Sequence, residues 1–279
     1  ALVNSFLMKH IFTTVLVMTA WLVNGQDFRP VAGGDLPGLT VLRSDTFSLQ
    51  TVAQFDPQRQ TLYAEYGFRA GYLIDYQLNG EITRLQVAVL KDGPSAFGLY
   101  SLEADTCRQR GLFTAFTCLN NDRFVAATGP LFIRSFSYGG TPNSEGLPQQ
   151  IAAMVIAGNP QDQWFFPAVF RLPQLQPYSR PARFMCGPAG LAKGAPGLAD
   201  LLDGMDFECY AMEIVAPQYS GNLARLSFPE FSLVDDFLAR AGLSLSPTND
   251  PVLTVDGTYR SWYKINESKI IFLECSSPE

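Results

Sequence analysis

Carboxylates are the side chains of this chain best suited to hydrolytic chemistry, because histidine is almost absent. Two Asp or Glu groups on either side of a glycosidic bond are sufficient to hydrolyse it. Six acidic residues are candidates for such a pair: Glu65, Asp75, Asp203, Asp206, Glu208 and Glu213. Their spacing does not show which of them converge, and Asp203 and Asp206 are typical of a turn after a short helix. A carboxylate-dependent hydrolase acting on glycans is therefore the alternative function.

The scarcity of histidine argues against most other catalytic systems. The single histidine of the 279 residues is His10, which lies in a segment with the pattern of a secretion leader. Removal of that leader leaves no imidazole, the commonest general base and a frequent zinc ligand. Ser-His-Asp and Cys-His nucleophile systems are then absent as well.

No motif in the sequence predicts a metal or a cofactor. The pattern GPAGLAK at residues 187–193 lacks the spacing of a phosphate-binding loop, so a simple helix entry is favoured. There is no Asp-rich calcium loop, and the cysteines lack the paired spacing of a zinc site. We therefore expect neither a metal nor a cofactor.

Disulfides are permitted if the protein is exported. The five cysteines are Cys107, Cys118, Cys186, Cys209 and Cys275. We favour a bond between Cys107 and Cys118, because they flank a short segment that can turn back on itself. A bond between Cys186 and Cys209 is the second possibility. The third is that all five are free thiols, which often pack as small hydrophobes.

Aromatic clusters are candidates for a contact surface. Trp164, Phe165 and Phe166 precede Pro167 in a proline-rich segment, where an aromatic run is hard to assign to a core strand. We take these three residues as candidate contacts for a protein or glycan partner. Packing in the core is the alternative for this cluster, as it is for Trp262-Tyr263.

Residues 8–26 have the pattern of a secretory signal peptide. Lys9 and His10 precede an apolar run at residues 11–23, and small residues then favour cleavage before Gln26. The run is shorter than the roughly 20 residues that span a bilayer, and no later run is longer. Residues 1–7 lie before Met8 and are interpreted as an over-extended start. We expect residues 1–25 to be removed and the mature chain, without a transmembrane segment, to reach the periplasm or cell surface.

Composition narrows the range of partners. The formal net charge is −6, and an acidic protein repels the phosphate backbone of nucleic acids, so we expect no nucleic-acid partner. Charged residues make up 16% of the chain, below the usual value of about 25%. Together with abundant aromatic residues, this composition is typical of a well-buried, strand-rich globular protein and argues against disorder.

The clearest local pattern is a hairpin. Strand-like runs at residues 72–78 and 82–90 surround Asn79-Gly80, which favours a tight turn. A helix is expected from Asp56, acting as its cap, to Gly67. The other expected elements are a helix at 96–104, strands at 112–118, 123–127 and 131–138, helices at 147–156 and 198–202, strands at 207–216 and 222–228, a helix at 232–241, and strands at 259–265 and 269–274.

The same order of helix, hairpin, helix and strands occurs twice. It predicts an α+β fold with antiparallel sheets and covering helices, in two tandem related halves at residues 26–158 and 182–279. Between them, residues 159–181 are rich in proline and are interpreted as a linker or surface crossing. The alternative is a single mixed sheet without internal symmetry.

Three short stretches and one helix carry a resemblance. The stretches are LYAEYGF at residues 62–68, GPSAFGLYS at residues 93–101 and RFMCGPA at residues 183–189, and the helix is at residues 232–241. In this order they resemble a family of exported bacterial proteins of unknown function, of a type common in Bacteroidetes. The chain departs from the family at residues 55–57, where members carry an Asn-Gly-rich entry to the first helix. The resemblance implies an exported setting, and it assigns no catalytic or binding residue because the family has no established activity.

The preferred interpretation is a noncatalytic binding or accessory module of the cell envelope. It rests on the absence of histidine, of a metal-ligand set and of a nucleophile motif. The partner is unknown, either a protein or a glycan.

Overall fold

The structure is a computed structural model of the chain. It describes residues 28–54, 56–104, 107–114, 116–120, 123–139, 146–159, 166–217, 220–246 and 250–276. The chain divides into two compact units, residues 1–30 and 31–279, and every element named below belongs to the second unit. The predicted leader lies outside the described residues. None of the described helices has both the length and the apolar character needed to cross a membrane.

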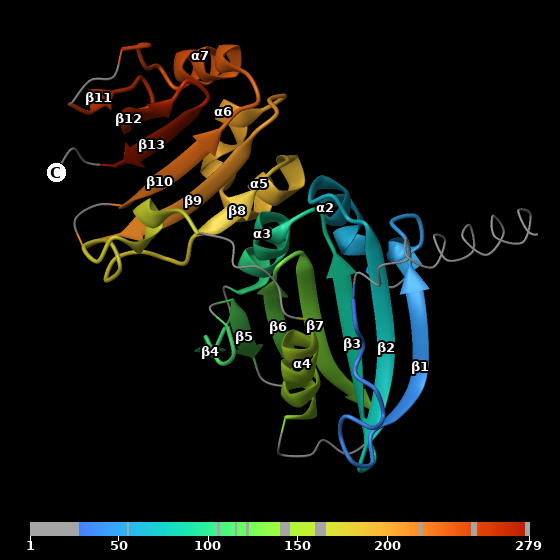
Figure 1. Cartoon of the computed structure of the whole chain (residues 1–279). Helices are drawn as coiled ribbons and strands as arrows, with labels where there is room; N and C mark the ends of the chain where they lie inside the picture. The colour runs from blue at the N-terminus through green and yellow to red at the C-terminus, as the bar shows by residue number, and fades with distance from the viewer. Residues whose placement is uncertain are drawn as a thin grey trace, which may run out of the picture. The chain divides into compact units, whose positions relative to one another are not determined.

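The first half of the chain forms a seven-stranded antiparallel sheet (Figure 1). Its strands are β1 (Thr40–Phe47), β2 (Ala70–Leu78), β3 (Glu81–Val89), β4 (Gln109–Arg110), β5 (Thr117–Asn120), β6 (Arg123–Thr128) and β7 (Leu131–Gly139). Their order across the sheet is β1-β2-β3-β7-β6-β5-β4. The predicted hairpin is confirmed, and Asn79 and Gly80 have φ values of 49° and 84°, the left-handed conformation that such a turn needs.

Two helices cover opposite faces of this sheet. Ala88 and Phe132 share one face and pack against α3 (Gly93–Glu103). Val87 and Ile133 share the other face by strand alternation, and α4 (Leu147–Gly158) contacts β3, β6 and β7. The sheet is therefore buried on both faces where these helices lie.

Two details of the predicted elements were wrong. The expected helix after Asp56 is split into η2 (Pro57–Arg59) and α2 (Gln60–Glu65), and the Asp56 side chain does not cap it. Residues 112–114 form no strand. Instead, the hydroxyl of Thr117 accepts a hydrogen bond from the amide of Leu112 and donates one to the carbonyl of Thr114, which closes a loop there.

The second half forms a six-stranded antiparallel sheet. Its strands are β8 (Arg183–Met185), β9 (Glu208–Val215), β10 (Ser220–Ser227), β11 (Val252–Leu253), β12 (Tyr259–Asn266) and β13 (Lys269–Cys275), in the order β11-β12-β13-β10-β9-β8. One face packs against α5 (Pro188–Gly194), α6 (Ala199–Leu202) and α7 (Phe231–Arg240). Phe170 in η4 (Ala168–Arg171), within the proline-rich crossing, packs on the other face.

The two sheets share one topology, except that β4 of the first sheet has no counterpart in the second. In each, a first strand pairs with a hairpin, and the second strand of that hairpin pairs with the last strand of a second hairpin. Helices also fall at matching places: α2 corresponds to α5 and α6, and α3 corresponds to α7. The predicted α+β fold with related antiparallel sheets is confirmed, and the alternative of one mixed sheet is excluded.

Candidate functional site

Residues from the stretches 62–68, 93–101 and 183–189 meet at a junction between the first half and β8. The hydroxyl of Tyr66 donates to the carbonyl of Phe184 over 2.7 Å, and the amide of Phe184 donates to Ser101 Oγ over 3.2 Å. These bonds satisfy the backbone amide and carbonyl of Phe184 in β8, which is an edge strand of its sheet. The side chains of Tyr66, just after α2, and Ser101, in α3, thus cover this edge of the sheet.

Glu65 ties a second element to the same junction. Its carboxylate accepts hydrogen bonds from the amides of Ala189 and Gly190, over 2.6 and 2.9 Å, at the start of α5. A carboxylate at a helix N-terminus is favoured by the helix dipole and by unpaired amides. Gly187 leaves room for it, since a Cβ there would lie 2.6 Å from Glu65 Cδ. Glu65 therefore has a structural role, in which its carboxylate caps the start of α5.

The other candidate carboxylates are held in different places. Asp75 on β2 makes two hydrogen bonds to Arg84, over 2.8 and 2.9 Å. Burial acts to raise the pKa of Asp75, but hydrogen bonds from Arg84 and Tyr138 outweigh it and lower that pKa. Glu213 on β9 pairs with Arg180 over 3.0 Å. Asp203, Asp206 and Glu208 are exposed after α6 and at the start of β9.

A nearly buried charge network was missed by the sequence analysis. It consists of Asp56, Arg59, Gln86, Glu103 and Arg134. The guanidinium of Arg59 pairs with Asp56 and, over 2.7 Å, with Glu103. The guanidinium of Arg134 lies 3.0 Å from Asp56 and 3.4 Å from Glu103, and it donates to Gln86 over 2.8 Å. Two carboxylates are thus matched by two guanidiniums.

Burial is the largest single influence on the pKa values of Arg59 and Arg134 in the charge network. It lowers the pKa of Arg134, an effect that the negative charge of Glu103 offsets only in part. Burial acts on Arg59 in the same direction, but Glu103 and Asp56 outweigh it and raise that pKa. Burial also raises the pKa of neighbouring Tyr63. The network links β3, β7, α3 and the turn before α2, and we interpret it as structural.

A basic pocket lies on the helix-covered face of the second sheet. Its volume is about 350 Å³, within the range of about 300–1,000 Å³ that is usual for ligand sites. One wall is the sheet itself, where Arg183 on β8 pairs with Ala211 on β9, and Glu213 on β9 pairs with Asn222 on β10. The other wall is formed by residues 193–198, at the end of α5 and in η5 (Pro196–Leu198).

Basic side chains outnumber acidic ones in this pocket. Arg180 and Glu213 form an ion pair, with 63% and 43% of their side chains exposed. Arg183 donates to the carbonyl of Gly194 over 2.8 Å. Lys193, in the last turn of α5, is exposed and takes no part in the ion pairs found among the described residues. In a chain with a net charge of −6, this local positive charge attracts anions.

The predicted aromatic contact lies mostly outside the described residues, which include neither Trp164 nor Phe165. Phe166 is described and half-buried, and its ring contacts those of Phe97, Phe170 and Tyr210. Phe166 is therefore part of an aromatic cluster in the core, while a contact role for Trp164 and Phe165 stays a prediction. Trp262 is buried and donates from Nε1 to the carbonyl of Ser244.

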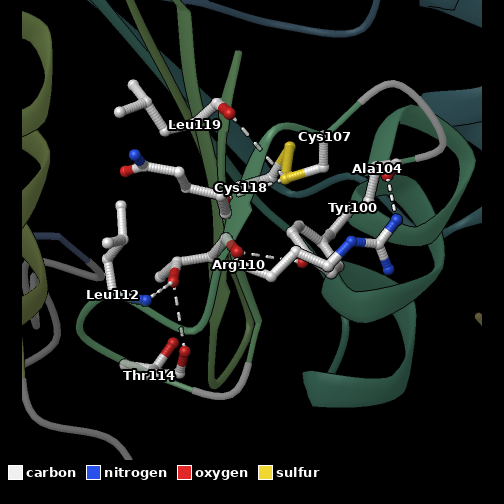
Figure 2. The surroundings of a disulfide bond; sticks show 10 residues. Tyr100, Ala104, Cys107, Arg110, Leu112, Thr114, Cys118 and Leu119 are labelled. Carbon is white, nitrogen blue, oxygen red and sulfur yellow. Dashed lines mark hydrogen bonds between the residues drawn. A yellow bond between two sulfur atoms is a disulfide. The ribbon is translucent and has the colours of Figure 1, made fainter.

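A disulfide joins Cys107 and Cys118, the pairing that the sequence favoured. Figure 2 shows it between the segment that follows α3 and strand β5, close to Tyr100 and Arg110. The hydroxyl of Tyr100 donates to the carbonyl of Thr117 over 3.2 Å, and Arg110 donates to the carbonyl of Ala104. The bond therefore fastens the short β4–β5 edge of the first sheet to the end of α3.

We expect the unfolded, unreduced protein to contain three free thiols, those of Cys186, Cys209 and Cys275. In the folded protein, burial raises the pKa of Cys186 to about 12 and also raises that of Cys209, so both should resist alkylation. A count of five thiols would contradict the disulfide.

Replacing Cys107 and Cys118 by alanine should lower the free energy of unfolding by about 3 kcal/mol, because the disulfide no longer closes the loop between them.

No cluster of three or more metal-ligating side chains occurs in the described part of the chain. Comparison of the chain with protein-family models, with curated proteins and with solved structures found no match.

Proposed function

We propose that this chain is a noncatalytic binding module that is exported and acts in the periplasm or at the cell surface. The basic pocket is the observation that carries the binding role. It is of ligand size and brings together charged and amide side chains from three strands and the end of a helix. In ligand sites, a few convergent polar groups fix the orientation of the ligand and provide specificity.

The noncatalytic part of the proposal is supported by what the carboxylates do. A glycosidase needs two carboxyl groups that face one substrate, with one of them acting as an acid. Glu65 caps a helix, Asp75 is bound by Arg84, and Glu213 is paired with Arg180. Asp56 and Glu103 lie together, but both are held by two arginines in the charge network.

The exported setting is supported by the leader pattern at residues 8–26 and by the resemblance to exported bacterial proteins. The Cys107–Cys118 disulfide agrees with it, because such bonds persist in oxidising compartments. N-terminal sequencing of protein recovered from the cell envelope should begin at Gln26.

A binding screen that also detects cleavage tests the proposed function. The purified protein is incubated with envelope glycans and envelope protein fractions, and both retained and degraded material are measured. We expect saturable retention without degradation. Turnover that is lost on replacing a single Asp or Glu by its amide would overturn the noncatalytic proposal, and no retention of any fraction would overturn the binding role.

A further inference from the structure

We infer that the basic pocket binds a small hydroxylated carboxylate, such as an acidic sugar. This inference rests on the proposed function, because it names the class of ligand for the same site. The pocket presents the exposed side chains of Arg180 and Lys193 to an anionic group. The forked guanidinium of arginine matches a planar carboxylate, and lysine adds a flexible positive charge.

The size of the pocket favours an organic anion over a single inorganic ion. Its volume of about 350 Å³ lies in the range of about 300–1,000 Å³ that small-molecule sites usually have. A simple ion would leave most of that space to solvent. A ring of sugar size with one carboxylate fills more of it and reaches both walls.

The acidic and amide groups of the pocket select for hydroxyl groups on the same ligand. Glu213 and Asn222 are paired across β9 and β10, so their side chains share the face that lines the pocket. A carboxylate accepts hydrogen bonds only, so Glu213 favours a ligand hydroxyl and repels a second negative charge. This disfavours a doubly charged phosphate and favours a singly charged, hydroxylated ligand.

The Arg180–Glu213 ion pair does not block such a ligand. Both side chains are more than one third exposed, and exposed ion pairs are held weakly because water screens them. A ligand hydroxyl can therefore donate a hydrogen bond to Glu213 while Arg180 binds the ligand carboxylate.

Calorimetric titration of the purified protein with glucuronate, glucose and inorganic phosphate tests the inference. We expect glucuronate to bind, glucose to give no binding, and phosphate to bind more weakly than glucuronate. Lys193→Ala should weaken glucuronate binding about tenfold, the usual effect of losing one hydrogen bond to a charged group. The matched variant Lys264→Ala removes a lysine from the same sheet, outside the pocket, and should leave binding unchanged.

The variant Glu213→Gln tests the relative affinity for glucuronate and phosphate, which would not change if Glu213 had only a structural role. Removing the negative charge should strengthen phosphate binding and reduce the preference for glucuronate. An unchanged preference, equal binding of glucose, or tighter binding of phosphate by the unaltered protein would overturn the inference. If glucuronate fails while the envelope screen still detects saturable retention, this inference falls and the proposed function stands. If both fail, both fall.

Discussion

Replacing Glu103 by alanine is expected to lower the free energy of unfolding by about 3–5 kcal/mol, the usual cost of removing one partner from a buried ion pair. Glu103 is paired with both Arg59 and Arg134, and the side chains of the three are only 8%, 14% and 11% exposed. Without Glu103, two guanidiniums share the single carboxylate of Asp56. Denaturant unfolding followed by circular dichroism measures the loss.

A matched control separates this effect from ordinary surface electrostatics. Glu267 is 75% exposed and pairs with Lys264 over 2.8 Å, so Glu267→Ala should change the free energy of unfolding by at most about 1 kcal/mol. Glu103→Gln, which keeps the shape but not the charge, should fall between the two. Similar losses for Glu103→Ala and Glu267→Ala would mean that the charge network is solvated and carries little stability.

Replacing Gly98 by alanine is expected to lower the free energy of unfolding by about 3 kcal/mol, at the upper end of the usual cost of overpacking a core. A Cβ at Gly98 would lie 2.1 Å from Cε1 of Tyr66 and 3.0 Å from the ring of Phe184. Tyr66 and Phe184 are fully buried, and the Tyr66 hydroxyl is bonded to the Phe184 carbonyl. The ring therefore cannot move aside without breaking the junction.

Gly158 provides the control for this substitution. It is the last residue of α4, and a Cβ there would meet nothing within 4 Å. Gly158→Ala should be neutral or stabilise by up to about 1 kcal/mol, because alanine has the higher helix propensity. The double variant Gly98→Ala, Tyr66→Leu should lose less free energy of unfolding than the two single variants lose together, because the smaller leucine side chain removes the clash. Strict additivity would contradict the proposed contact.

Local signals explain the parts of the fold that the sequence predicted well. Asn79-Gly80 specifies its own turn, whatever the two strands later pack against. The helix expected at 96–104 begins three residues earlier, at Gly93, where the side chain of Asp92 accepts a hydrogen bond from the amide of Ser95 over 2.9 Å and Pro94 suits the first turn. Cys107 and Cys118 lie 11 residues apart in the sequence and close a short loop.

Local signals misled where a distant partner took the side chain. Asp56 has the type and position of a helix cap, yet its carboxylate is paired with Arg59 and with Arg134, which is 78 residues away. Glu65 was a candidate catalytic carboxylate, yet it caps a helix 124 residues further along the chain. A carboxylate alone in a sequence does not reveal which of these partners it will meet.

The sequence by itself determined the α+β class, the hairpins and the helix between them, because turns, caps and strand alternation depend on neighbouring residues. Only the tertiary structure decided which partners the polar side chains meet. Sheet register placed Arg134 beside Gln86 and Glu213 beside Asn222, and the end of α5 brought Lys193 to the same pocket. The charge network, the junction and the basic pocket are each built by residues far apart in the chain, whose meeting depends on packing that no short stretch encodes.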